Sequence, residues 1–168
     1  MSATYETLFR RTSTNPILTA AGWPYPVHTV FNAGATLLRD GTTLLLCRVE
    51  DRTGRSHLCA ARSKDGVGEW IIDPHPTFPA DPENHPEELW GVEDPRITWV
   101  EELGRYAVAY TAFGKGGPGV SLALTLIWLR SIVALKLSFV TGTSGGAKYR
   151  IAPTSGSGLG STSTASVG

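Results

Sequence analysis

The C-terminal part of this chain contains no acidic residue at all. The 168-residue sequence has 15 Asp and Glu and 15 Lys and Arg, so its formal net charge is zero. All the carboxylates lie at or before Glu102, where nine Lys and Arg oppose 15 acids and leave a charge of −6. Residues 103–168 carry only cations. Because a folded domain of that length without Asp or Glu is unusual, we expect the two parts of the chain to differ in character.

The sequence also lacks a secretory signal, a membrane-spanning run and a metal-ligand pattern. The first 12 residues include Arg10 and Arg11 but no apolar core. The longest apolar stretch, 122–140, contains Arg130 and Lys136, and each cation would cost about 2.5–3.5 kcal/mol inside a bilayer. The two cysteines and four histidines show no zinc-ligand spacing. We therefore expect a cytoplasmic protein with no membrane span and no bound metal.

Cysteine is scarce, and the two thiols fall at related positions. If the runs around them form a hairpin centred near Thr53, Cys47 and Cys59 face each other across two strands. In a cytoplasmic protein such a pair stays reduced. We expect two free thiols rather than a disulfide.

Glycine and proline, by contrast, are abundant, at 19 and 11 residues, which favours turns and strands. Runs rich in β-branched and aromatic residues recur about every 8–15 residues, separated by turn signals such as Asp40-Gly41. The predicted strands cover residues 35–38, 42–49, 57–62, 70–73, 96–100, 105–112 and 120–124. With no sustained helical period, the pattern predicts an all-β sandwich, barrel or propeller. The stretch from Ser63 to Trp70 is similar to a turn that several sugar-cleaving propellers carry once per blade.

The composition changes at Thr125. Residues 141–168 contain seven Gly, six Ser and five Thr, and a segment of this kind buries too little apolar surface to offset its ordering entropy. We divide the chain into residues 1–125 and an atypical tail, 126–168. The tail is either a natural disordered segment or the product of a shifted reading frame, and only the second also explains the missing acids.

Two adjacent carboxylates, Glu93 and Asp94, stand before a proline and an arginine. Because a residue that precedes proline favours the extended region, Pro95 predicts an extended Asp94, and the two carboxylates then point to opposite sides of the chain. One of them can face a cleft while the other makes structural contacts. The alternative is an acid–arginine pair that only stiffens the entrance to a strand.

Two further groups of polar residues are candidates for binding. Around the expected hairpin tip, Arg48, Asp51 and Arg55 belong to a cluster of three arginines, two acids and a histidine. The planar guanidinium fork suits phosphate or sugar oxygens, although a solvated tip whose charges pair with one another is the alternative. Asn32, between Phe31 and small residues, is either a turn residue or a donor and acceptor that faces a cleft.

Taken in order, these segments resemble glycoside hydrolase family 130, the β-mannoside phosphorylases and related mannosidases. The matching motifs cover residues 15–125 and are Asn15-Pro-Ile-Leu, Phe31-Asn-Ala-Gly-Ala, Arg48-Val-Glu-Asp-Arg, Ser56-His-Leu, Gly91-Val-Glu-Asp-Pro-Arg-Ile-Thr and Gly117-Pro-Gly-Val-Ser-Leu-Ala-Leu-Thr. The resemblance implies a five-bladed β-propeller with a central cleft. At about 40–45 residues per blade, a propeller needs roughly 200 residues to close. The chain would then hold an incomplete propeller of about two to three blades.

The resemblance also implies a reaction, the inverting phosphorolysis of a β-mannoside to mannose 1-phosphate. Inorganic phosphate is the co-substrate, and no other cofactor is needed. Asp94 matches the acid that assists the leaving oxygen through a sugar hydroxyl. To serve near neutral pH, its pKa must be raised by desolvation and by Glu93. Since Arg96 would lower that pKa, we expect its side chain to turn aside.

The remaining site residues follow from the same resemblance. Asn32, Arg48 and Glu93 match positions that contact the sugar or phosphate, and Asp51 and Arg55 lie in the matching hairpin. The partners are therefore a β-mannoside oligosaccharide and phosphate, with no membrane partner.

Two alternatives remain open at this point. The same scaffold hydrolyses β-mannosides if a second carboxylate activates water. A partial propeller can also be an inactive carbohydrate-binding module, provided that it forms a homo-oligomer. A nucleic-acid partner is not expected, because four cations spread over residues 126–168 form no dense basic patch.

Overall fold

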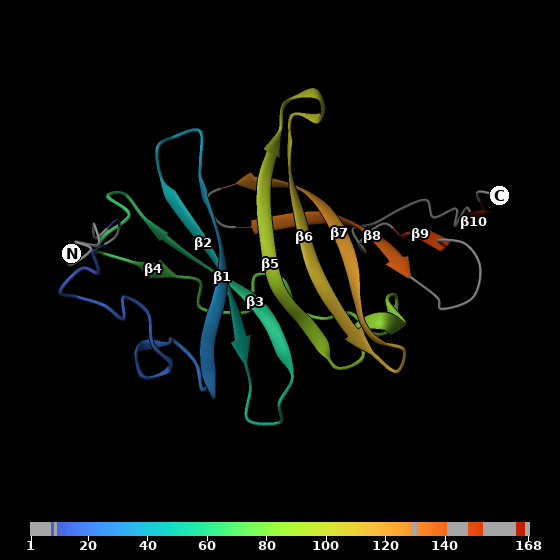
Figure 1. Cartoon of the computed structure of the whole chain (residues 1–168), viewed down its shortest axis with the longest axis horizontal. Coiled ribbons are helices and arrows are strands. Elements are labelled where there is room, and N and C mark those ends of the chain that lie inside the picture. The colour runs from blue at the N-terminus through green and yellow to red at the C-terminus, as the bar shows by residue number, and fades with distance from the viewer. Residues whose placement is uncertain (1–7, 9, 129–130, 141–147, 153–163, 167–168) are drawn as a thin grey trace, which may run out of the picture.

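The computed structural model describes residues 8, 10–128, 131–140, 148–152 and 164–166, with side chains as far as residue 125. These residues form strands and three short 3-10 helices (Figure 1). The strands are β1 (Thr29–Leu37), β2 (Thr43–Glu50), β3 (Ser56–Ser63), β4 (Ile71–Ile72), β5 (Gly91–Val100), β6 (Arg105–Gly114), β7 (Gly117–Trp128), β8 (Ser131–Val140), β9 (Lys148–Ala152) and β10 (Thr164–Ser166). The 3-10 helices are η1 (Ala20–Gly22), η2 (Pro86–Glu88) and η3 (Glu101–Leu103). The predicted all-β class is confirmed.

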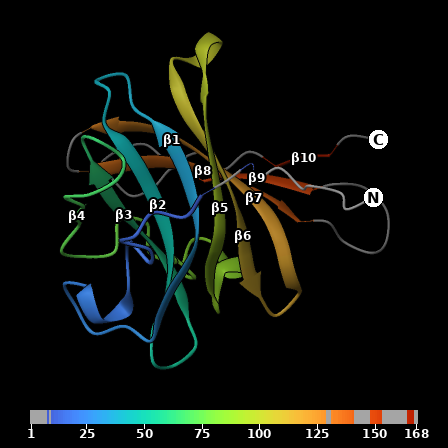
Figure 2. The same cartoon turned by 60° about the vertical axis from the view of Figure 1, so that its left-hand side comes forward.

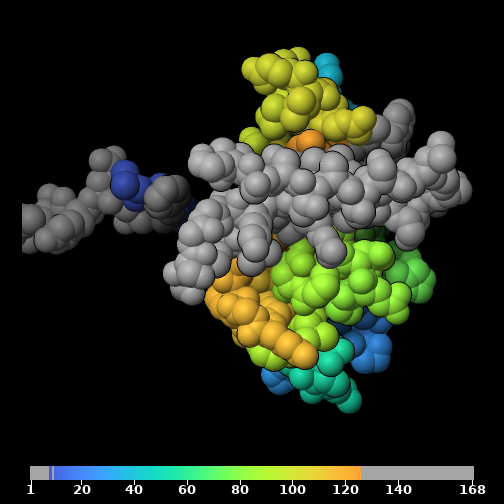
Figure 3. Space-filling model, turned by 90° about the vertical axis from the view of Figure 1, so that its right-hand side faces the viewer, coloured from blue at the N-terminus to red at the C-terminus, as the bar shows by residue number. Residues whose placement is uncertain are grey.

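The strands form one open sheet with the order β1-β2-β3-β5-β6-β7-β8-β9-β10, and β4 pairs with β3 beside that path. Neighbouring strands are antiparallel except at β3 and β5, which share a single parallel pair, Ser56 with Gly91. The sheet therefore divides into two antiparallel groups, β1 to β4 and β5 onward (Figures 1 and 2). The β5–β6 turn at η3 projects from the rest of the molecule (Figure 3).

Two glycines bring the groups together. A Cβ at Gly34 of β1 would lie 2.6 Å from the carbonyl oxygen of Pro95 in β5. A Cβ at Gly91, where φ is 134°, would lie 2.6 Å from the carbonyl oxygen of Ser56. Because both contacts are to backbone, a side chain at either position would push the strands apart. The close approach holds β1 beside β5, as both ribbon views show.

The main core lies between the two groups of strands. Leu44, Leu46 and Leu58 of the first group are fully buried and pack in one cluster with Val92 and Val108 of the second. Side chains two residues apart on a strand share a face, so Arg48 continues the row of Leu44 and Leu46. The sequence thus places a cation at the end of an apolar core.

The other face of the first group is covered by the segment before β1. Trp23, Cys47, Val49 and Cys59 form a second buried cluster, with Tyr25 packed against it. Cys47 pairs directly with Cys59 in the β2–β3 register, and both thiols are free, as predicted. Burial raises the pKa of the Cys47 thiol to about 12, with the neighbouring Cys59 adding to the effect. Both cysteines are therefore packing residues.

Beyond residue 125 the structure describes only residues 126–128, 131–140, 148–152 and 164–166. The predicted boundary falls inside β7, and the described residues that follow it belong to β7, β8, β9 and β10. The rest of the predicted tail, 129–130, 141–147, 153–163 and 167–168, lies outside the described residues. The disordered or frame-shifted character of 126–168 therefore stays a prediction. No helix in the described part of the chain is long and apolar enough to cross a membrane.

Candidate functional site

Each of the two adjacent strands β1 and β5 carries a β-bulge. The register of β1 against β2 shifts between Phe31 and Gly34, and that of β5 against β6 shifts between Glu93 and Arg96. In both places two residues oppose one on the partner strand, so one residue is extra. A bulge of this kind bends the strand and turns a side chain away from the regular alternation.

Both bulges hold a polar residue in the left-handed region. The φ angles are 45° at Asn32 and 48° at Asp94. Asn and Asp tolerate this conformation better than other residues with a Cβ, because their short side chains find local hydrogen bonds. Here the two side chains bond each other, and Asn32 Nδ2 donates to Asp94 Oδ1 at 3.0 Å. The two bulges thus bring the side chains of residues 62 positions apart into direct contact.

The guanidinium of Arg48 joins this pair to two more side chains. Its Nη1 donates to Asp94 Oδ1 at 3.1 Å, and its Nη2 donates to Glu93 Oε1 at 2.9 Å. Its Nε donates to Ser56 Oγ at 3.0 Å. On its remaining side the guanidinium lies over the ring of Phe31, 4.6 Å from the centroid. One cation is therefore held by two carboxylates, a hydroxyl and an aromatic face, and this cluster (Asn32, Arg48, Glu93 and Asp94) is the candidate site.

The two carboxylates of the site differ in their electrostatics. Burial raises the pKa of Glu93 above its usual value, while Arg48 opposes the shift and the charges of Asp94 and Glu50 add to it. Burial also acts to raise the pKa of Asp94, but the hydrogen bonds from Asn32 and Arg48 outweigh it and hold the pKa below its usual value. Asp94 is also the more exposed of the two, at 36% of its side chain against 15% for Glu93.

These findings correct two predictions about the acidic pair. Glu93 and Asp94 do not point to opposite sides, because the bulge at Asp94 brings both carboxylates to the same guanidinium. The predicted upward shift in the pKa of Asp94 is also wrong for this arrangement, because two donors share its Oδ1 atom.

The side chain of Arg96 turns away from the Asp94 carboxylate, as predicted. Its Nη1 donates to the carbonyl oxygen of Pro95 at 2.9 Å and lies 3.5 Å from the carbonyl oxygen of Asp94. The guanidinium thus bonds backbone rather than the Asp94 carboxylate. Its charge still helps to lower the pKa of Asp94, after the larger effects of Asn32 and Arg48.

Asp51 and Arg55 lie at the turn between β2 and β3, and Asp51 shapes that turn. Asp51 Oδ1 accepts hydrogen bonds from the backbone N–H groups of Thr53 and Arg55 and from the Thr53 hydroxyl. These bonds lower the pKa of Asp51 against a desolvation effect that acts to raise it. Arg55 is exposed. The structure therefore does not bring these two residues into the Arg48 cluster, and a substrate contact at either stays a prediction.

Ser56 and Phe31 also contact Arg48, although the sequence patterns assign them no role. Ser56 is 2% exposed and accepts from Arg48, and Phe31 is the residue directly opposite Arg48 in the β1–β2 register. Strand pairing alone would have found Phe31, because cross-strand partners lie close together. Ser56 lies two pairs further along β3, and its contact depends on the reach of the arginine side chain.

The fold is similar to those of solved carbohydrate-active enzymes. One structure, described as a member of the GH130 family of mannoside phosphorylases, which contains glycoside hydrolases that target β-1,2-mannosidic linkages in Candida mannan, has a TM-score of 0.62 and 22% identity. The match covers 84% of this chain and 52% of that one. A glycosyl hydrolase from Bacteroides ovatus has a TM-score of 0.61, 22% identity and the same coverage of both chains.

A third structure, a provisionally assigned glycoside hydrolase from Parabacteroides distasonis, has a TM-score of 0.61 and 20% identity, over 86% of this chain and 56% of that one. No protein-family model and no curated protein matches the sequence. At these identities the likeness shows the fold. The chain spans about half the length of these structures, and the expected resemblance to an N-terminal portion of the GH130 fold is confirmed at that level.

Proposed function

We propose that residues 1–125 are the N-terminal part of a family 130 enzyme that cleaves β-mannosides by inverting phosphorolysis. The observation that carries the proposal is the convergence on Arg48. Asn32, Glu93 and Asp94 come from motifs far apart in the sequence, and all three side chains meet within hydrogen-bond distance of one another or of that guanidinium. The fold likeness to a GH130 structure supports the same function.

The strand arrangement supports a propeller as the scaffold. Propeller blades are four-stranded antiparallel sheets around a central channel. The groups β1 to β4 and β5 to β8 each have four strands, and β1 and β5, the first strand of each group, lie beside each other. In this proposal they are the innermost strands of two blades, and their bulges face the channel.

The charge of the cluster favours a sugar over phosphate at this point. Arg48 faces Glu93 and Asp94, and Glu50 Oε2 lies 3.8 Å from the same guanidinium. Three carboxylates around one cation repel a free anion, whereas a sugar hydroxyl both donates to a carboxylate and accepts from a guanidinium. We infer that these residues bind the mannoside, and that the phosphate subsite is completed by the rest of the full-length enzyme.

Asp94 is the proton donor in this proposal. Phosphate attacks the anomeric carbon while Asp94 supplies a proton to the departing oxygen through a sugar hydroxyl, so no base is needed to activate water. As an acid, Asp94 must lose part of the stabilisation that Asn32 and Arg48 give its charged form. A bound sugar does this when its hydroxyls take over those donors and its bulk excludes water, because both changes raise the pKa.

Product analysis tests this function. A chain that carries residues 1–125 and continues to the length of the matched structures is incubated with a β-mannobiose, with and without inorganic phosphate. Mannose 1-phosphate that forms only with phosphate supports phosphorolysis. Free mannose formed at equal rates in both reactions assigns hydrolysis on the same scaffold instead, and the absence of any turnover contradicts both.

A further inference from the structure

Arg48 lies among three carboxylates but approaches only two of them closely. Its Nη2 lies 2.9 Å from Glu93 Oε1 and its Nη1 lies 3.1 Å from Asp94 Oδ1, whereas Glu50 Oε2 is 3.8 Å from Nη2. Yet Glu50 is the nearest of the three in the sequence. It follows Arg48 by two residues on β2, so the two side chains share one face of that strand. A further contact must therefore direct the guanidinium toward β5.

The ring of Phe31 does not supply that direction. It lies against the flat face of the guanidinium, 4.6 Å from the ring centroid. A contact of this kind fixes the plane of the guanidinium but leaves its direction within that plane open. The direction has to come from a hydrogen bond that lies in the plane.

The hydroxyl of Ser56 makes such a bond. Its Oγ accepts from Arg48 Nε at 3.0 Å, and Ser56 is only 2% exposed. Because the nitrogens of a guanidinium are fixed in one plane, an acceptor at Nε also sets where Nη1 and Nη2 point. With the hydroxyl of Ser56 in place, these two nitrogens face Glu93 and Asp94.

The backbone of Ser56 is itself held against β5. Ser56 forms the parallel pair with Gly91. A Cβ at Gly91 would lie 2.6 Å from the carbonyl oxygen of Ser56 and 2.7 Å from its amide nitrogen, so the two strands touch at this point. Glu93 and Asp94 follow Gly91 closely in β5. The hydroxyl that orients Arg48 is therefore fixed relative to the strand whose carboxylates Arg48 binds.

We propose that Ser56 is a positioning residue, which directs Arg48 to Glu93 and Asp94 and away from Glu50. The inference rests on the proposed function, because it names a residue that prepares the site for a mannoside. Without the hydroxyl, Arg48 Nε is a largely buried donor that has lost its partner, which is unfavourable. The guanidinium then turns toward Glu50, and the sugar meets carboxylates that are no longer held.

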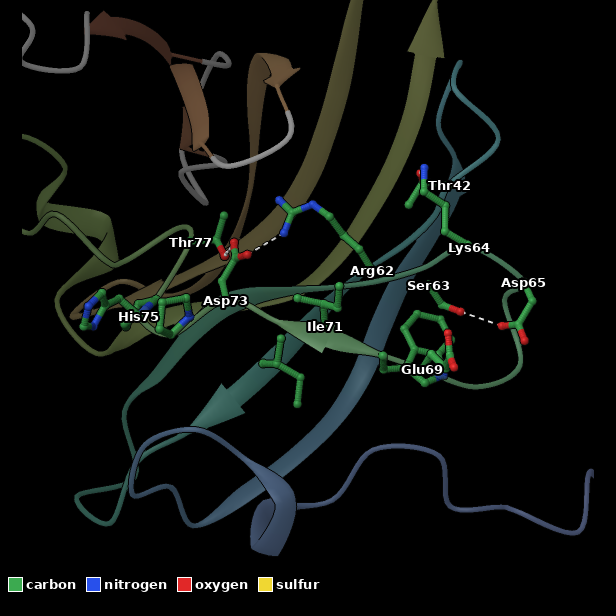
Figure 4. A pocket seen from close by; sticks show the side chains of 14 residues that line it. Thr42, Arg62, Ser63, Lys64, Asp65, Glu69, Ile71, Asp73, His75 and Thr77 are labelled. Carbon is green, nitrogen blue, oxygen red and sulfur yellow. Dashed lines mark hydrogen bonds and ion pairs between the residues drawn. The ribbon is translucent and has the colours of Figure 1, made fainter.

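Crystal structures of the full-length enzyme test the geometry independently of activity. In Ser56→Ala we expect Arg48 to lie within hydrogen-bond distance of Glu50 and to lose its contact with Asp94. Ser63→Ala is the matched control, because Ser63 is also 2% exposed and lies at the other end of β3, where its hydroxyl bonds Asp65 (Figure 4). Unchanged contacts of Arg48 in Ser56→Ala would overturn the proposal, whatever the turnover of the enzyme.

Steady-state kinetics of the same proteins test the consequence for the substrate. Ser56→Ala should raise the KM for the mannoside about three- to tenfold and leave kcat within about threefold, while Ser63→Ala changes neither. Ser56→Cys keeps the volume of the side chain but offers only a weak acceptor, and should behave like Ser56→Ala.

A double variant separates positioning from a loss of packing. Adding Glu50→Gln to Ser56→Ala removes the competing carboxylate, and it should return KM toward the wild-type value. A KM that stays at the wild-type value in Ser56→Ala, or that Glu50→Gln does not lower, overturns the proposal. A wild-type enzyme without turnover contradicts the proposed function instead, and the crystal structures then decide the role of Ser56.

Discussion

Arg48 shows how one side chain organises a site. Its Nε, Nη1 and Nη2 atoms each have a different acceptor, and its flat face lies on Phe31. Only a planar fork with fixed directions satisfies three acceptors and an aromatic ring together. The role of Arg48 thus rests on shape as much as on charge.

This leads to a prediction for Arg48→Lys in the full-length enzyme. Lysine keeps the charge but cannot hold Ser56, Glu93 and Asp94 at once, so the two carboxylates lose their fixed positions. We expect the KM for the mannoside to rise at least tenfold, as measured by steady-state kinetics at saturating phosphate. Unchanged kcat and KM would show that Arg48 does not position the substrate.

In the turn from Ser63 to Trp70, Asp65 has a structural role. The motif that is similar to propeller turns uses Asp65 to accept backbone N–H groups, so its carboxylate holds the turn. Hydrogen bonds from Gly68, Val67 and Ser63 lower the pKa of Asp65 to about 2.

Asp65→Ala should therefore lower the Tm at neutral pH. Because the folded pKa lies below the unfolded one, the contribution of Asp65 is fully present above pH 3.8 and is lost as the pH falls toward about 2. Thermal melts of both proteins between pH 7 and pH 2 should show Tm values that converge in acid. A Tm difference that stays constant with pH would exclude this electrostatic origin.

At the scale of elements, the bulges of β1 and β5 set the geometry of the site. Sequence motifs identified Asn32, Arg48, Glu93 and Asp94, because those residue types recur in a known order. The same patterns predict the wrong side-chain directions for Glu93 and Asp94. A regular strand alternates its side chains, and the bulge shifts that alternation by one residue. Pro95 predicts an extended neighbour, and the hydrogen bonds of Asp94 override that preference. Local propensity therefore predicted the strands, while contacts between distant strands decided the site.

Gly34 gives a direct measure of the contact between β1 and β5. In Gly34→Ala the new Cβ meets the Pro95 carbonyl, and overpacking of this kind costs about 1–3 kcal/mol. Denaturant unfolding should show that loss of stability. Gly116→Ala is the matched control, because nothing lies within 4 Å of its Cβ, and it should change stability little. Equal stabilities for the two variants would mean that the strands do not approach as described.

At the scale of the whole molecule, the chain spans about half the length of the structures it matches. A propeller of roughly 200 residues closes on itself, whereas a part of one leaves blade faces and strand edges exposed. On the described surface Val120 is already 62% exposed. A shifted reading frame after residue 125 stays a prediction, with a natural tail as the alternative, and resequencing the codons for residues 125–135 would test it.

The 168-residue chain by itself should therefore be inactive and self-associating. Analytical ultracentrifugation should show oligomers or aggregates, and thermal melting should be broad. A sharp monomeric melt, or turnover of a β-mannoside with phosphate, would contradict this description of the chain.

In the proposed function Asp94 is the acid of a β-mannoside-cleaving site, and the kcat of Asp94→Asn in the full-length enzyme measures that role. The amide keeps the size of the side chain but cannot supply the proton, so kcat should fall by more than 100-fold while KM stays within about threefold. Glu102→Gln, at an exposed position of η3, is the comparison and should retain most of its kcat. An Asp94→Asn enzyme that keeps more than a tenth of the wild-type kcat would contradict the assignment.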